Sequence, residues 1–228
     1  MDHLNMTVPV GAIYGFIGEN GSGKSTTEKL ICGHLVPNQG TIRLFGKPYT
    51  DPGVRVRVGA LIENAGCFPG SSVYQNLMMQ AINLNLAEPD REIRRVLEIV
   101  RMDGEARTKF KKCSLGMKQR IGIAMALLGN PALLILDEPI NGLDTDGMRL
   151  MREILVDITE NCSATVLISS HILGELEKIA THYGIIRQGR MIQELSAMDM
   201  ESRARVFVSV KTGDMPRSKE LLLSLIHI

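Results

Sequence analysis

Short apolar runs, bounded by glycine, proline or acidic residues, alternate with stretches of helical period along most of this 228-residue chain. The runs AIYGFIG, VGALIE, LLILDEP and ATVLISS are compact and apolar, which predicts buried strands. The stretches KSTTEKLICGHL, Met117–Leu128, Asp144–Glu160 and ILGELEKIA predict helices between them. Strands that alternate with helices predict an α/β fold with a mostly parallel sheet covered on its faces.

Two further patterns predict short antiparallel or turn elements. TIRLFG reads as a short strand between the turns PNQG and GKPY. YGIIRQGRMIQEL reads as a hairpin-like pair of strands that turns at Gly189.

The alternation stops between Ser71 and Lys112. Two helical stretches, Ser72–Asn85 and Pro89–Arg101, follow one another there without a strand candidate between them. We therefore expect a helical lobe to be inserted into the α/β core. The predicted division is residues 1–64 and 113–205 for the core, 65–112 for the lobe and 206–228 for a C-terminal remnant.

Composition narrows the classes of protein without naming one. A hydrophobic content of 44% and a charged content of 22% are typical of a globular chain, and a net charge of +1 disfavours nucleic-acid binding. The four cysteines are far apart and form no CxxC pair, which argues against a zinc site or a disulfide framework and favours a reducing cytosol. No apolar run approaches the roughly 20 residues that span a bilayer. At a membrane, another chain would have to supply the membrane part.

A glycine-rich loop after the first predicted strand fits the phosphate-binding pattern G-x-x-x-x-G-K-[ST]. Backbone N–H groups of such a loop turn onto phosphate oxygens at the positive end of the next helix. Lys24 would add a charge for the β- and γ-phosphates, and the Ser25 hydroxyl could ligate Mg²⁺. The predicted nucleotide-binding residues of this loop are Gly18, Glu19, Asn20, Gly21, Ser22, Gly23, Lys24, Ser25 and Thr26.

LLILDEP supplies a candidate partner for this loop. Asp137 ends the apolar strand, where a carboxylate can meet Mg²⁺, and Glu138 follows in a position suited to a general base. The alternative for these two residues alone is an acidic turn at the end of a strand. The phosphate loop upstream favours the catalytic interpretation.

Three further motifs make the chain resemble the ABC ATPases, a family of P-loop NTPases. CSLGMKQR resembles the family's signature sequence, NGLD its D-loop, and SSH the switch histidine, here His171. The resemblance extends from Met1 to about Leu195. By position alone, the signature serine could be a plain helix cap, and His171 could cap the next helix.

The resemblance implies a function as well as a fold. Two ATP-binding subunits, either two copies of this chain or this chain and a related subunit, would dimerise head to tail when they bind ATP. The dimer would drive a separate membrane permease and would contact the membrane only through that permease. Glu138, His171 and Lys24 would then carry catalysis, with ATP and Mg²⁺ as cofactors. The partner subunit would hold the nucleotide with Ser114, Leu115, Gly116, Met117 and Asp144. We expect the chain to be cytoplasmic, on the inner face of the cell membrane.

One departure from the family concerns Glu63, in GALIENAGCF, where most members have glutamine. Glutamate there could ligate the metal as an anion, together with Ser25 and Asp137. The family members that use glutamate resemble bacitracin and lantibiotic self-protection exporters, so we expect export of an antimicrobial peptide or antibiotic. Phe68, Val73 and Tyr74 are candidates for docking the permease, with ordinary packing as the alternative.

The two ends of the chain also differ from the family pattern. HLNMTVPVG resembles the strand just before the loop, so the first strand and the adenine-stacking aromatic are expected to be missing. Tyr14 is expected to pack rather than to stack on adenine. Leu223–Ile228 matches the translation of a transposon end used for sequencing libraries, so we expect an artefact there and a fragment truncated at both ends. A short helix or strand is the alternative.

Two other functions stay open at this point. A soluble ABC ATPase that acts on DNA or ribosomes usually has a coiled-coil insertion or two ATPase domains, and this chain has one phosphate loop. A non-hydrolysing module would only dimerise or signal. Glu138 and His171 are both present, which argues against it.

Overall fold

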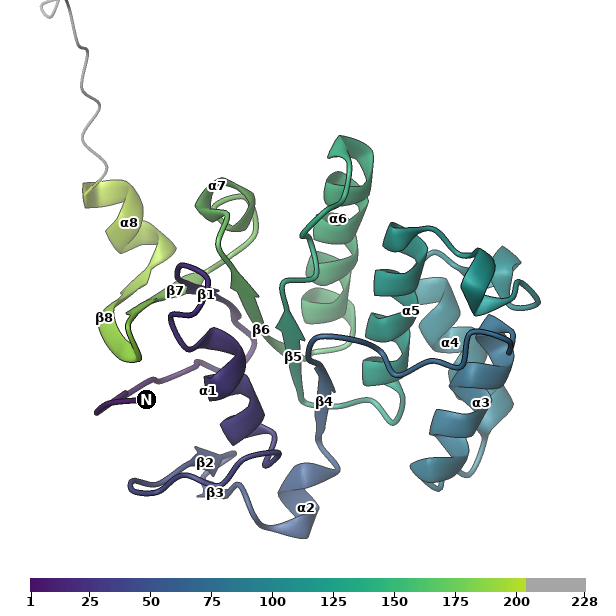
Figure 1. The fold of residues 1–228 in the computed structure, drawn as a ribbon, viewed down its shortest axis with the longest axis horizontal. Helices are drawn as coiled ribbons and strands as arrows, with labels where there is room; N and C mark the ends of the chain where they lie inside the picture. The colour runs from purple at the N-terminus through teal and green to yellow at the C-terminus, as the bar shows by residue number, and fades with distance from the viewer. Residues whose placement is uncertain (204–228) are drawn as a thin grey trace, which may run out of the picture. The chain divides into compact units, whose positions relative to one another are not determined.

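The computed structural model describes residues 1–203, and within this part the main sheet has six strands (Figure 1). Their order is β4-β5-β6-β1-β7-β8. The bounds are Ile13–Ile17 for β1, Val58–Leu61 for β4, Leu133–Asp137 for β5, Thr165–Ser170 for β6, His182–Arg187 for β7 and Arg190–Ser196 for β8. Neighbouring strands are parallel except β7 and β8, which form the predicted hairpin. The predicted α/β fold with a mostly parallel sheet is confirmed.

The helices predicted from the sequence are present in the predicted order, and two short helices that were not predicted, α2 and α8, are present as well. Their bounds are Lys24–Ile31 for α1, Pro52–Arg55 for α2, Val73–Asn83 for α3, Pro89–Ile99 for α4, Leu115–Leu127 for α5, Thr145–Asn161 for α6, Leu173–Leu176 for α7 and Ala197–Arg203 for α8. Helix α1 contacts β5, α5 contacts β4 and β5, and α6 contacts β6. The sheet is therefore covered by helices, as an apolar parallel sheet requires.

The core beneath α1 is formed by apolar side chains from four strands. Tyr14 and Phe16 of β1, Ile135 of β5 and Ile186 of β7 belong to one buried cluster. Tyr14 is only 1% exposed, and its hydroxyl donates to Glu194 Oε1 at 2.6 Å. Burial also raises the pKa of Tyr14. The expectation that Tyr14 packs is confirmed, because its ring has no free face for a base.

Two glycines let β4 and α5 approach closely. A Cβ atom on Gly59 would lie 2.0 Å from the Ala126 carbonyl oxygen, and one on Gly122 would lie 2.8 Å from Leu61 Cδ1. Any larger side chain would overpack this contact. The contact fixes α5, and with it the helices packed on α5, beside the edge strand β4.

The predicted helices between Ser71 and Lys112 are present as α3 and α4, which pack on each other and on α5 (Figure 1). Ser72 begins α3 with a capping box in which its side chain and that of Gln75 each accept a backbone N–H. The division into core and lobe stays a prediction, because Met1–Ala197 forms one compact unit. The predicted remnant 206–228, with the proposed artefact Leu223–Ile228, lies outside the described residues.

Three details differ from the predictions. HLNMTVPVG contains no strand, because the Asp2 N–H donates to Gly189 O and the Thr7 N–H to the Glu194 side chain rather than to a strand ladder. GKPY is not only a turn: β2 (Arg43–Leu44) and β3 (Lys47–Pro48) form a small hairpin that turns at Phe45–Gly46, where φ is 53° and 78°. Helix α7 ends early, because the Thr181 N–H bonds to the Ile13 carbonyl and directs the chain into β7.

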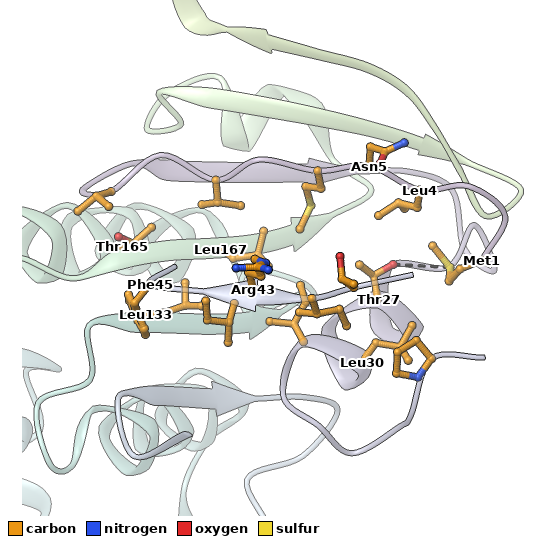
Figure 2. Close-up of a pocket in the computed structure, with 18 residues that line it drawn as sticks. Met1, Leu4, Asn5, Thr27, Leu30, Arg43, Phe45, Leu133, Thr165 and Leu167 are labelled. Atoms are coloured by element: carbon orange, nitrogen blue, oxygen red, sulfur yellow. Dashed lines mark hydrogen bonds between the residues drawn. The ribbon is translucent and has the colours of Figure 1, made fainter. Parts of the chain in front are cut away.

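The N-terminal segment, α1 and the β2–β3 hairpin enclose a cavity of about 360 Å³ (Figure 2). Leu4, Leu30, Phe45, Leu133 and Leu167 are among its mostly apolar lining residues. None of the predicted catalytic or metal-binding residues lines it. The cavity is therefore separate from the site described next.

Candidate active site

The phosphate-loop edge consists of the loop Gly18–Thr26 together with Asp137, Glu138 and His171. The loop follows β1, Asp137 ends β5 with Glu138 directly after it, and His171 follows β6. Strands β1, β5 and β6 are parallel neighbours, so their carboxyl ends meet at one edge of the sheet. The fold therefore brings together residues that lie up to about 150 positions apart in the sequence, as ligand sites of open α/β sheets require.

Glycines shape the loop by different means. A Cβ atom on Gly18 would lie 2.5 Å from Ser22 Oγ and 2.6 Å from the Ile186 carbonyl, so a side chain has no room. Gly23 begins α1 with φ of 111°, a conformation that side chains rarely adopt. The loop thus turns tightly into α1, whose first N–H groups are directed towards the loop.

Lys24 and His171 approach the Glu138 carboxylate from two sides. Lys24 Nζ lies 3.3 Å from Glu138 Oε1, and His171 Nδ1 lies 2.8 Å from Glu138 Oε2. Lys24 is 5% exposed and also donates to the carbonyls of Gly18 at 2.7 Å and Glu19 at 3.3 Å. Glu138 itself has φ of 50°. The three predicted catalytic residues are therefore in mutual contact through Glu138.

His171 does not cap the following helix. Helix α7 has Ile172 at its N-cap position and no side-chain hydrogen bond there. The alternative interpretation of His171 as a helix cap is therefore wrong, and its imidazole is instead paired with Glu138.

Ser169 connects the two acids at the end of β5. Its hydroxyl donates to Asp137 Oδ1 at 2.8 Å and accepts the Glu138 N–H at 3.1 Å. Ser169 is fully buried. The Asp137 carboxylate is therefore held in one orientation at the floor of the loop.

Glu28 lies behind this arrangement, one turn after Lys24 on α1. It is fully buried, and neither carboxyl oxygen has a hydrogen bond of regular geometry. Burial, followed by the charge of Asp137, raises the pKa of Glu28 to about 8. Ser169 and Lys24 oppose this rise. The chain thus places a second carboxyl group against Asp137, and the charge of Lys24 only partly offsets the cost of burying it.

The donors at this edge suit Mg²⁺. Ser25 offers a hydroxyl and Asp137 a carboxylate, both hard oxygen ligands. No group of three or more His, Cys, Asp or Glu side chains able to hold a metal ion occurs within residues 1–203. Mg²⁺ needs no such cage, because it retains waters and uses one or two carboxylates with substrate phosphates.

Glu63 lies in the loop after β4, beside the same edge. It lines a pocket of about 260 Å³ together with Asp137, Glu138 and Gln119. Its Oε1 lies 2.5 Å from Lys29 Nζ of α1. The predicted metal ligand is therefore close to the phosphate-loop edge but paired with a lysine.

The signature surface consists of Ser114–Met117 and Asp144 and lies elsewhere. All five residues line one pocket of about 400 Å³, and no residue of the phosphate loop lines it. Ser114 caps α5 by accepting the Met117 N–H at 3.3 Å, and Asp144 caps α6 by accepting the Gly147 N–H at 2.9 Å. Helix capping is therefore confirmed for Ser114, and nucleotide contact at this surface stays a prediction.

The candidate docking residues divide into two kinds. Phe68 is 60% exposed, whereas Val73, the first residue of α3, is fully buried. Tyr74 is partly exposed, and its hydroxyl bonds to Asp90. Val73 is therefore a packing residue, and its proposed docking role is wrong.

Three contributors to the site escaped the sequence analysis: Glu28, Lys29 and Ser169. Glu28 and Lys29 stand in the polar run KSTTEK, which gives no sign that one is buried and the other paired with a distant acid. Ser169 could have been suspected from its position in SSH, two residues before His171.

Comparisons with known proteins agree with this geometry. Residues 1–141 match the family model described as ABC transporter. The bacitracin transport ATP-binding protein BcrA of Bacillus licheniformis is 38% identical over 97% of this chain and 73% of its own length. The lantibiotic transport ATP-binding protein SrtF of Streptococcus pyogenes is 36% identical over 91% of this chain and 89% of its own.

Solved structures give the same assignment. CbiO1 of Clostridium perfringens, part of the ABC transporter complex CbiONQ, superposes with a TM-score of 0.79 at 27% identity, covering 88% of this chain and 83% of its own. A dimeric ATP-binding cassette bound to ADP and Pi shares the fold, with a TM-score of 0.76 at 21% identity and 90% coverage of both chains. The phosphate loop, the paired acids and the histidine meet at one sheet edge, in agreement with these matches. The chain therefore belongs to the ABC transporter family, as one of its ATP-binding and ATP-hydrolysing subunits.

Proposed function

We propose that this chain hydrolyses Mg²⁺-bound ATP at the phosphate-loop edge, with Glu138 as general base. The observation that carries the proposal is the Glu138 carboxylate held between Lys24 at 3.3 Å and His171 at 2.8 Å. A carboxylate oriented in this way can take a proton from an attacking water. His171 would keep the carboxylate and the water in position.

The loop and its neighbours would hold the substrate. Backbone N–H groups of Gly18–Thr26 would bind the phosphates, and Lys24 would leave Glu138 to neutralise phosphate charge. Ser25 and Asp137 would hold Mg²⁺, with Glu63 as a third oxygen donor. When bound, Mg²⁺ neutralises charge on the phosphates. Ser169 would keep Asp137 oriented for this task through its 2.8 Å hydrogen bond.

ATPase subunits of this family dimerise and work with a separate membrane permease. For this chain we infer a head-to-tail pair with a second copy or a related subunit. The signature surface would then close on the nucleotide held by the partner's phosphate loop. The exposure of Ser114, and its distance in the fold from the chain's own loop, support this arrangement.

No helix within residues 1–203 is long and apolar enough to cross a membrane. From the membrane complexes of the ABC transporter family we infer that the subunit docks on its permease at the inner face of the cell membrane, with Phe68 as a candidate contact. The relatives named for bacitracin and lantibiotic transport support an antimicrobial peptide as the exported substrate.

Replacing Glu138 tests the hydrolytic proposal. We expect Glu138→Gln to lower steady-state ATP turnover by about 100-fold or more, because the general base is lost. The same variant should elute as an ATP-bound dimer in gel filtration with ATP and Mg²⁺, whereas the parent returns to monomer. Glu160→Gln, on the exposed end of α6, serves as the control and should behave as the parent does. Undiminished turnover by Glu138→Gln would contradict the assignment of the base.

The substrate class is tested in cells. A bacitracin-sensitive strain that lacks its own BcrA but retains the permease should regain resistance when it expresses this chain. The Glu138→Gln variant, expressed to the same level, should not restore it. Unchanged sensitivity with an active, equally expressed ATPase would count against peptide export.

A further inference from the structure

Two lysines of α1 hold two glutamates at the ends of neighbouring strands. Lys24 lies 3.3 Å from Glu138, and Lys29 lies 2.5 Å from Glu63. Strands β4 and β5 pair with Leu61 opposite Leu136, so the two glutamates stand at equivalent positions just beyond their strand ends. Both glutamates have positive φ, 64° and 50°. The second pair thus repeats the geometry of the catalytic one.

The two pairs differ in exposure. The side chains of Lys24 and Glu138 are 5% and 21% exposed, whereas those of Lys29 and Glu63 are 32% and 61% exposed. A pair that water reaches is weak and opens readily. Glu63 also lines the same pocket as Asp137 and Glu138, so a Glu63 carboxylate freed from Lys29 would remain beside the proposed Mg²⁺ ligands.

We propose that Lys29 is a positioning residue that competes with Mg²⁺ for the Glu63 carboxylate and so sets the Mg²⁺ concentration at which nucleotide is held. This inference rests on the proposed Mg²⁺ site at Ser25 and Asp137. Lys29 touches neither nucleotide nor metal and acts through Glu63 alone.

The competition follows from charge. Carboxylate oxygens are preferred ligands of Mg²⁺, but an ammonium group at 2.5 Å occupies Glu63 Oε1. Mg²⁺ has to displace that ammonium and then tolerate a like charge nearby. A neutral side chain at position 29 would leave Glu63 free and would lower the Mg²⁺ requirement.

Nucleotide binding measures this effect without hydrolysis. Fluorescent mant-ADP is titrated with Mg²⁺ for the parent, Lys29→Gln, Lys29→Arg, Glu63→Gln and the Lys29→Gln, Glu63→Gln double variant. Lys29→Gln should lower the half-saturating Mg²⁺ concentration by about twofold to fivefold, the range that an exposed ion pair supports. Lys29→Arg keeps the charge and should match the parent. In the Glu63→Gln background, Lys29→Gln should have no effect.

Lys178→Gln is the matched control, because Lys178 is 52% exposed and pairs at 2.8 Å with Glu175 of α7, not with a residue of the phosphate-loop edge. The inference falls if Lys29→Gln shifts the midpoint no more than Lys178→Gln does, or if its shift persists without Glu63. Asp137→Asn separates this inference from the proposed function. If Asp137→Asn abolishes the Mg²⁺ dependence and Lys29→Gln does nothing, only the inference fails. If parent binding is independent of Mg²⁺, the proposed Mg²⁺ site at Ser25 and Asp137 fails, and this inference fails with it.

Discussion

The phosphate-loop edge and the signature surface both present polar groups suited to a nucleotide, but they hold those groups differently. At the phosphate-loop edge, Lys24, Asp137 and Glu138 are each contacted by side chains or carbonyls from other elements. At the signature surface, the Ser114 and Asp144 side chains accept hydrogen bonds from the backbone of the helices that they cap. The first region is organised by the chain itself, and the second offers helix N-termini to solvent.

This difference separates what one subunit can do alone from what a pair can do. Charged groups that are already oriented and partly buried can bind phosphate without reorganisation. Helix N-termini on an open surface attract anions more weakly, because water competes for them. The comparison therefore predicts that damage to the signature surface spares nucleotide binding by the monomer and removes hydrolysis by the dimer.

Gly116→Asp should separate ATP turnover from nucleotide binding most strongly. An acidic side chain in the first turn of α5 interacts favourably with the helix dipole, so the variant should still fold. A Cβ atom at position 116 would meet only Leu143 Cδ2, at 3.3 Å. The added charge repels phosphate, and we expect ATP turnover to fall about 100-fold, as for the loss of a preorganised donor. Binding of mant-ADP to the monomer should stay unchanged. Steady-state hydrolysis and fluorescence titration measure the two effects.

Gly116→Asn is the control for this change, since it has the same size without the charge. It should retain much more turnover than the aspartate variant. Equal loss of mant-ADP binding and of turnover in Gly116→Asp would mean that the signature surface serves the chain's own phosphate loop. The contrast between the two regions would then be broken.

The sequence predicted the elements well where apolar runs are uninterrupted. Strands β1, β5 and β6 have nearly the expected bounds, because each is a buried run that only a strand position satisfies. The segment before β1 and helix α7 were predicted less well. Their structure depends on single hydrogen bonds to distant residues, such as the Thr181 N–H to Ile13 O, which no local pattern shows.

The candidate site divides in the same way. The phosphate-loop pattern and the end of an apolar strand identified Lys24, Asp137 and Glu138, whereas His171 was identified through the resemblance to the ABC ATPases. The partners of these residues could not be predicted. Glu28 and Lys29 are adjacent in the sequence, yet the helix turns one into the core and the other towards Glu63. Which face of α1 is buried is decided by the sheet, not by the polar run itself.

The buried Glu28 carboxyl sharpens the comparison on the buried side through the pH dependence of stability. Its pKa is raised to about 8 in the folded protein, from an ordinary carboxyl value of 4.5. The folded state therefore binds more protons than the unfolded state between these pH values, and stability falls as pH rises from about 5 to about 8. The slope is at most about 1.4 kcal/mol per pH unit for one proton. Urea unfolding of protein free of nucleotide and metal, at several pH values, measures it.

Glu28→Gln cannot ionise and should remove this part of the slope, whereas Glu160→Gln on the exposed end of α6 should keep it. The difference between Glu28→Gln and the parent isolates the contribution of Glu28 from that of every group that the two proteins share. No comparable buried carboxyl lies among the residues that line the signature pocket. If Glu28→Gln retains the parent's slope, burial of the Glu28 carboxyl does not make the unfolding free energy depend on pH. The two regions would then differ only in their exposed groups.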